Sequence, residues 1–238
     1  MLPESVTEYR EAIRINPKYD KAYYNLGVAL RDLKETDGAI AAFREAILLT
    51  PTHEDAHRSL AYALETKGQI LEAIAHGKIA ARLNPRDPDA FHILGLMLYE
   101  KGDLPEALAA EKEAIKIFPN YAGFHNTLGR ILMKSSDRDA AFLEFKEAIR
   151  LNPRHLGALN SLGYLYTVRK QFPEAVSVLQ QAAKIDPTDA AVQMNLGVAL
   201  YFTGKKAEGR AEWEKVIASG KNKIFVAGAQ KYLAQYPG

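Results

Sequence analysis

Residues 51–60, PTHEDAHRSL, contain two histidines four positions apart, His53 and His57, with Glu54 directly after the first. On one helix this spacing places both imidazoles on the same face, as in the HExxH pattern of zinc peptidases, where the glutamate acts as general base. The continuation HEDAHRSLAYAL lacks the glycine and third histidine that one group of these enzymes adds. A glutamate farther along the chain stays open as a third ligand. The metal hypothesis therefore depends on whether the two histidines share a helix face.

Few other residues are arranged for chemistry. The chain has no cysteine, which excludes disulfides, thiolate metal sites and cysteine nucleophiles. The stretch YFTGKKAEG has a Gly-Lys pair without the upstream glycine of a phosphate-binding loop. Ser59 and Ser161 have no visible triad partners, and the carboxylates Glu111 and Glu113 are interpreted as parts of solvated helix faces. We expect no catalytic residue, no metal and no cofactor.

Composition points to a soluble folded protein. The 238 residues are 47% hydrophobic and 25% charged, with a formal net charge of +2. Basic residues are interspersed with acidic ones, so we expect no nucleic-acid binding. No stretch approaches the roughly 18 uninterrupted apolar residues of a membrane span, and the start MLPESVTEYREAI does not resemble a signal peptide. We expect a cytoplasmic protein, with the periplasm or secretion left open.

A period of 34 residues runs through the whole chain. A proline, a leucine, a small residue directly after that leucine, and two alanines all recur with it. The columns are Pro17, Pro51, Pro85, Pro119, Pro153 and Pro187; Leu26, Leu60, Leu94, Leu128, Leu162 and Leu196; Gly27, Ala61, Gly95, Gly129, Gly163 and Gly197; Ala39, Ala73, Ala107, Ala141 and Ala175; Ala46, Ala80, Ala114, Ala148 and Ala182. Five columns with one period indicate tandem copies of a single structural unit.

Each copy is expected to be a pair of helices. Residues 20–53 contain two apolar stripes whose members lie three or four positions apart, which is the spacing of a helix face. Gly27 and Ala39 are small because two antiparallel helices have to approach closely there. Pro105 and Pro173 stand where second helices should begin, a position that tolerates proline. The glycines expected in the tight turn between the helices are Gly68, Gly102 and Gly204.

These residues resemble the tetratricopeptide repeat (TPR) family. In the first repeat the matching positions are Tyr23, Leu26, Gly27, Leu30, Ala39, Phe43, Ala46 and Pro51. The resemblance implies an all-α fold, a right-handed α-solenoid of stacked antiparallel helix pairs that forms a TPR superhelix. We expect a half repeat with only the second helix at 1–19, six tandem 34-residue units over 20–223 and a C-terminal capping helix over 224–238.

This register gives the two histidines structural roles. His57 takes the aromatic position of a first helix and is expected to be buried, whereas His53 lies in the connecting loop or first turn. Two departures fall in the second helices, because Gly77 and Glu111 replace the large residue of repeats two and three. A glycine inside a helix costs about 1 kcal/mol relative to alanine, so repeat two is expected to be a soft point.

The resemblance also implies a function, that of a non-catalytic scaffold that binds an extended peptide or helix of a partner protein in a concave groove lined by the first helices. Tyrosine offers apolar area with a polar tip, and asparagine can both donate to and accept from a peptide backbone. The candidate peptide-binding residues are Arg58, Tyr62, Tyr99, Asn126, Arg130, Asn160, Tyr164, Met194, Val198 and Tyr201.

Several alternatives stay open. Some groove side chains could simply pack on one another, and the repeats could be the targeting or regulatory region of a larger enzyme or assembly. The residues that hold chaperone C-termini in related co-chaperones are not present in three successive repeats, so the partner's identity is unknown. The N-terminal end around Tyr9 and Ile13 lacks a covering helix and could mediate self-association.

Overall fold

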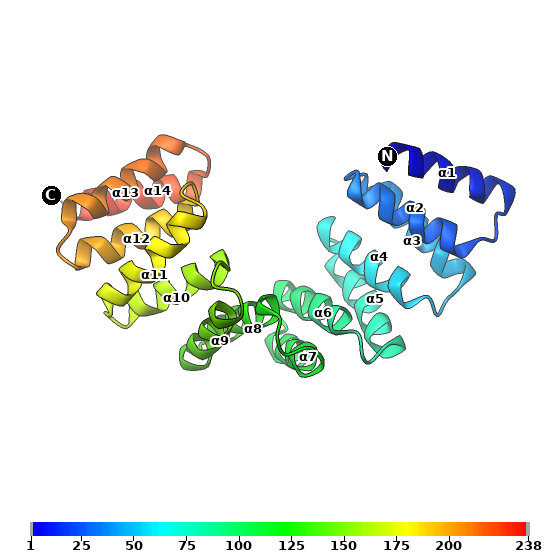
Figure 1. The fold of residues 1–238 in the computed structure, drawn as a ribbon, viewed down its shortest axis with the longest axis horizontal. Helices are drawn as coiled ribbons and strands as arrows, with labels where there is room; N and C mark the ends of the chain where they lie inside the picture. Colours follow the sequence, from blue (N-terminus) through cyan, green and yellow to red (C-terminus); the bar gives the residue numbers. More distant parts are fainter. Residues whose placement is uncertain (1, 237–238) are drawn as a thin grey trace. The chain divides into compact units, whose positions relative to one another are not determined.

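The computed structural model describes residues 2–236, with side chains from Glu4 onward. This part of the chain forms fourteen α-helices and no strand, which confirms the expected all-α class (Figure 1). The helices are α1 (Leu2–Ile15), α2 (Asp20–Asp32), α3 (Thr36–Leu49), α4 (Glu54–Thr66), α5 (Ile70–Leu83), α6 (Pro88–Lys101), α7 (Leu104–Ile117), α8 (Ala122–Lys134), α9 (Arg138–Leu151), α10 (Leu156–Val168), α11 (Phe172–Ile185), α12 (Ala190–Phe202), α13 (Lys206–Ser219) and α14 (Lys223–Gln235).

The chain divides into two compact units, an N-terminal unit over Met1–Pro119 and a C-terminal unit over Asn120–Gly238. Helices pack as hairpins, α2 on α3, α4 on α5 and α6 on α7 in the first unit, and α8 on α9, α10 on α11 and α12 on α13 in the second. We call α2, α4, α6, α8, α10 and α12 the first helices and their hairpin mates the second helices. Each first helix begins 34 residues after the previous one. The assignment of α1 as a half repeat and α14 as a cap stays a prediction.

The turn inside each hairpin requires a left-handed residue. Gly68, Gly102 and Gly204 supply it with φ of 72°, 95° and 90°, as the sequence predicted. The equivalent positions of the other three hairpins hold non-glycine residues with the same sign of φ, namely Lys34, Ser136 and Lys170. The hairpin geometry therefore prevails even where the side chain disfavours it by about 1–2 kcal/mol.

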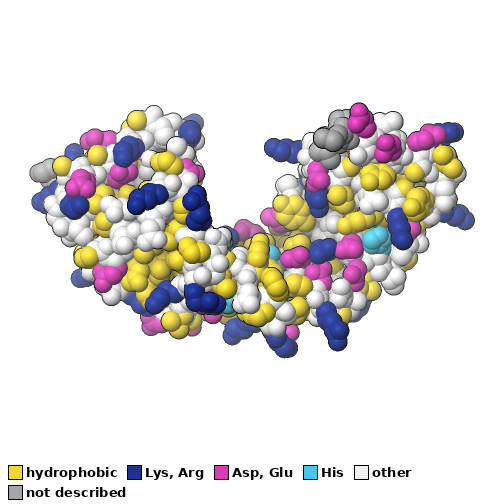
Figure 2. All heavy atoms as spheres, in the orientation of Figure 1, with side chains coloured by type: hydrophobic (Ala, Val, Ile, Leu, Met, Phe, Trp, Pro, Cys, Tyr) yellow, Lys and Arg dark blue, Asp and Glu magenta, His cyan; other side chains and the backbone are white. Residues whose placement is uncertain are grey.

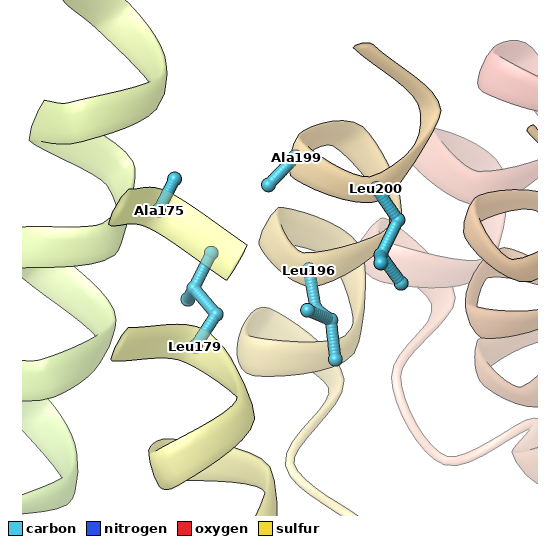
Figure 3. Close-up of a cluster of buried hydrophobic side chains, with 5 residues drawn as sticks. All are labelled: Ala175, Leu179, Leu196, Ala199 and Leu200. Atoms are coloured by element: carbon cyan, nitrogen blue, oxygen red, sulfur yellow. The ribbon is translucent and has the colours of Figure 1, made fainter. Parts of the chain in front are cut away.

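Close approach between the two helices of a hairpin explains the column of small residues. A Cβ atom on Gly27 would lie 2.5 Å from Phe43 Cε1, and one on Gly129 would lie 2.6 Å from Phe145 Cε1. Successive hairpins are joined by apolar clusters; one of these consists of Ala175 and Leu179 of α11 with Leu196, Ala199 and Leu200 of α12 (Figure 3). Small residues set the spacing within a hairpin, and aliphatic ones fill the space between hairpins.

Glu111 contradicts its sequence-based interpretation as a solvated carboxylate. Its side chain is fully buried, with Oε1 and Oε2 lying 2.8 and 3.1 Å from Nδ1 of His92. The carboxylate occupies the place of the large second-helix residue, where it accepts a hydrogen bond from His92. Glu113 is solvated as expected and pairs with Lys116 at 3.0 Å. Among residues 2–236, no helix has the length and apolar character needed to cross a membrane.

Candidate peptide-binding surface

His53 and His57 have separate structural roles, as the register predicted. His53 precedes α4, and its Nδ1 accepts a hydrogen bond from the backbone N–H of Ala56 at 3.4 Å. His57 is buried, its Nε2–H donates to the carbonyl oxygen of Pro51 at 3.1 Å, and its Nδ1 lies 2.9 Å from Nδ1 of His76. A neutral His57 that donates through Nε2 must accept through Nδ1, so His76 is the donor in this pair. Within the described residues, no three His, Cys, Asp or Glu side chains are grouped to hold a metal.

The first helices of the N-terminal unit line a groove of about 520 Å³. Its lining residues are Tyr24, Arg31, Arg58, Ser59, Tyr62, Asp89, His92, Ile93 and Leu96, from α2, α4 and α6. Two predicted site residues, Arg58 and Tyr62, lie in this groove, and Tyr62 is 48% exposed. A third, Tyr99, is half-buried farther along α6. The structure therefore groups part of the predicted set around one concave surface.

Arg58 is already engaged by carboxylates. Its guanidinium lies 2.5 Å from Asp55, 3.0 Å from Asp87 and 3.6 Å from Asp89. The sequence had singled out Arg58 alone, because its acidic neighbours come partly from the following repeat. Tyr24, Arg58 and His92 lie 34 residues apart, at the same position of successive repeats, and this spacing is the signal that could add Tyr24 and His92 to the site.

In the C-terminal unit the predicted asparagines take part in different environments. Asn160 Oδ1 accepts from Asn195 Nδ2 at 2.8 Å. Asn126 Oδ1 is buried and has no hydrogen-bond partner among the described residues, and it lies beside the backbone of Gly157. Tyr164 is 40% exposed and Arg130 is exposed on α8. These side chains lie on the successive first helices α8, α10 and α12.

The prediction that Met194 faces an open groove is wrong. Met194 is buried in a cluster with Trp213, Val216 and Ala229, and its carbonyl oxygen accepts from Trp213 Nε1 at 3.2 Å. Helix α14 packs on α12 and α13 and covers this region. The sequence predicted the C-terminal helix, but it did not show which residues of α12 this helix would cover.

Val198 and Tyr201 are partly covered in the same way. Both pack against the cluster that contains Met194. The Tyr201 ring stacks on Trp213 with centroids 5.8 Å apart and contacts Tyr236 at 5.1 Å. The accessible candidates of the C-terminal unit are therefore the earlier ones, Tyr164 above all.

Comparison with known families agrees with the repeat pattern. A model described as TPR repeat matches residues 2–30 and 163–204, and models described as Tetratricopeptide repeat match residues 37–88, 58–122, 20–53 and 122–155. A search of curated proteins found no significant match.

Solved structures share the fold at low identity. The chain is similar to a chain of the Cut9–Hcn1 hetero-tetramer of APC/C, with TM-score 0.81 and 18% identity over 97% of this chain and 46% of that one, so it spans about half of that protein's length. It is similar to pilF of Pseudomonas aeruginosa, with TM-score 0.80 and 18% identity over 91% and 97% of the two chains. YrrB, described as a TPR protein with an unusual peptide-binding site, has TM-score 0.61 and 20% identity over 80% and 98%. The expected α-solenoid fold is confirmed, and the chain belongs to the tetratricopeptide repeat family.

Proposed function

We propose that this chain is a protein-interaction scaffold whose first-helix faces bind an extended segment of a partner protein. The groove along α2, α4 and α6 carries the proposal, because it exposes the Tyr62 ring beside other apolar and hydrogen-bonding side chains. Exposed tyrosine gives a large contact area with little conformational entropy to lose, which is typical of binding hot spots. YrrB, a structural neighbour, is described as having a peptide-binding site.

The C-terminal unit carries a second candidate surface on its own first helices. The hydrogen bond from Asn195 fixes the orientation of the Asn160 amide, so that its NH₂ group can donate to a backbone carbonyl of the bound segment. Tyr164, four residues later on α10, supplies apolar area next to it. An amide donor with an adjacent aromatic ring suits an extended peptide, whose polar backbone and side chains alternate along its length.

Selection from a random-peptide display library on the full chain tests this proposal. We expect selected peptides to lose affinity by about tenfold when Tyr62→Ala or Tyr164→Ala removes a contact ring. Leu71→Ala is the matched control, because Leu71 is an exposed apolar residue on the second helix α5. Selected peptides that bind equally well to all three variants would refute binding at the first-helix faces.

Two sequence-based alternatives stay predictions. Cut9–Hcn1, to which the chain is similar, is described as an APC/C hetero-tetramer, which supports a role for such repeats inside a larger assembly. Self-association through the N-terminal end is the other, and there Tyr9 and Ile13 are half-buried. A concentration series in analytical ultracentrifugation distinguishes a self-associating chain from a monomer.

A further inference from the structure

The groove of the N-terminal unit has an excess of negative charge around Arg58. One guanidinium faces three carboxylates, those of Asp55, Asp87 and Asp89. A single positive charge cannot neutralise three negative ones, so this cluster has two uncompensated negative charges. Figure 2 shows acidic side chains gathered around a basic one on the α4–α6 face.

The three carboxylates differ in how accessible they are. The Asp87 side chain is only 16% exposed and also accepts a hydrogen bond from the backbone N–H of Asp89 at the start of α6. The Asp89 side chain is 61% exposed and has the longest contact with Arg58, at 3.6 Å. Asp89 also lines the groove. It is therefore the carboxylate best placed to meet a charge on a bound segment.

Neighbouring basic groups do not offset this excess. Arg31, the other arginine of the groove, pairs with Asp32 at 3.0 Å, and His92 faces the buried carboxylate of Glu111. The helices α2, α4 and α6 together contain seven acidic and four basic residues. These three helices together thus carry a negative formal charge.

Apolar side chains border the same carboxylates. Tyr24, Tyr62, Ile93 and Leu96 line the groove together with Asp89. Lysine and arginine pack their aliphatic stems on apolar surface while the charged end reaches a carboxylate, and their cations are attracted to the faces of aromatic rings. Acidic and glutamine-rich segments carry no cation, so they would lack both the pairing with the carboxylates and the attraction to the ring faces.

We propose that this groove selects a partner segment in which a lysine or arginine stands next to an apolar side chain. The inference rests on the proposed peptide-binding function and names the partner's chemistry. Arg58, a candidate peptide-binding residue, holds the three carboxylates in place.

The peptides selected by display on the full chain provide the probes. Those whose binding depends on Tyr62 are expected to contain lysine or arginine, and changing these residues to glutamine should weaken binding about three- to fivefold. Asp89→Asn should have a similar effect, and Arg58→Gln should strengthen binding because it removes the competing cation. Rising salt should weaken the wild-type complex.

Glu113→Gln is the matched control, because Glu113 is an exposed carboxylate on the second helix α7. Circular dichroism checks that each variant is folded, and the exposed position of Asp89 makes Asp89→Asn decisive if Arg58→Gln is unfolded. Three outcomes would overturn the inference and leave the proposed function standing. The peptides that depend on Tyr62 could be acidic, their affinity could be unchanged by Asp89→Asn, or all selected peptides could depend on Tyr164 alone. Peptides that depend on neither tyrosine would overturn both.

Discussion

The two units differ in the type of residue at one position of the second helix, the position that packs against the small residue of the first helix. In the C-terminal unit the large second-helix residues are Phe145, Leu179 and Trp213, all fully buried. In the hairpins of the N-terminal unit only Phe43 is a large buried residue at this position, and the equivalent positions of the other two hairpins hold Gly77 and Glu111. The helix pairs nevertheless begin at the same 34-residue spacing in both units. The large residue is therefore not what sets the hairpin geometry.

Buried alanines are common to both units, and the N-terminal unit adds polar pairs where the large residue is missing. The alanines of the two recurring columns, such as Ala73 and Ala107 in one unit and Ala141 and Ala175 in the other, are fully buried. Beside Gly77 and at Glu111 the hairpins are bridged by hydrogen bonds, from His76 to His57 in one and from His92 to Glu111 in the next. These bonds are directional and depend on protonation. The C-terminal unit has one such pair, His125 with Glu144, but fully buried apolar residues fill the position of the large residue in all three of its hairpins. We therefore expect substitutions of these histidines and changes in pH to lower the stability of the N-terminal unit more than that of the C-terminal unit.

The largest expected effect is that of His92→Ala. It removes the hydrogen bond from His92 to the fully buried Glu111 carboxylate, which should lower the free energy of unfolding by about 3–5 kcal/mol. Trp213 is the chain's single tryptophan and lies in the C-terminal unit, so its fluorescence reports that unit, while far-UV circular dichroism reports both. In urea, we expect an early transition in circular dichroism that tryptophan fluorescence does not follow.

His125→Ala is the control for this experiment. It breaks the pair between His125 and Glu144, at 2.7 Å, in the C-terminal unit, but the Glu144 side chain is 27% exposed and can be hydrated. The loss should be smaller. Adding Glu111→Leu to His92→Ala should recover much of the stability, because an apolar side chain needs no partner. A loss for His125→Ala as large as that for His92→Ala would contradict the importance of burial.

Two glycine substitutions should change the free energy of unfolding in opposite directions. A Cβ on Gly129 would lie 2.6 Å from Phe145 Cε1, so Gly129→Ala should destabilise the protein by about 1–3 kcal/mol. A Cβ on Gly77 would meet Leu94 Cβ at 3.6 Å, an ordinary contact. Gly77→Ala should therefore stabilise by about 0.5–1 kcal/mol through its better helix propensity. Urea midpoints measure both changes, and equal signs would show that repeat two is not a soft point.

The smallest expected effect is a dependence of stability on pH. Burial lowers the pKa of His57 and of His76 below the usual 6.5. The hydrogen bond to Pro51 opposes this for His57, while His53 and Arg82 add to it; for His76 the neighbouring His57 and Arg44 add to it, and Glu72 opposes it. The unfolded chain then binds more protons, so stability is complete above pH 6.5 and falls as the pH drops below it.

Thermal melts between pH 8 and 5 measure this loss. His76→Gln should flatten the dependence, because the neutral amide can still donate to His57 Nδ1. The pKa of His155, in the C-terminal unit, is also lowered by burial. This residue contributes to the pH dependence of stability that remains in His76→Gln. An unchanged pH dependence in His76→Gln would exclude the histidine pair as its main source.

Local sequence signals predicted the fold well, because they act within one hairpin. The left-handed glycines such as Gly102 and the proline at the start of α11 follow from close neighbours in the sequence, and the burial of His57 follows from its position in the 34-residue repeat. The site was predicted less completely. Met194 is buried by a helix about thirty residues later in the chain, and the carboxylates around Arg58 come partly from the following repeat.

The amino-acid sequence by itself determined the 34-residue period, the helix pairs and the family, because each depends on side-chain size and helix-breaking residues at fixed local spacing. Only the tertiary structure decided which first-helix residues stay open and which charges meet. It buried Glu111 beside His92, placed Asp89 against Arg58 and covered Met194 with α14. Burial and electrostatics depend on distances between helices, and a repeat pattern fixes the positions of residues along one helix but not the chemistry of those that face them.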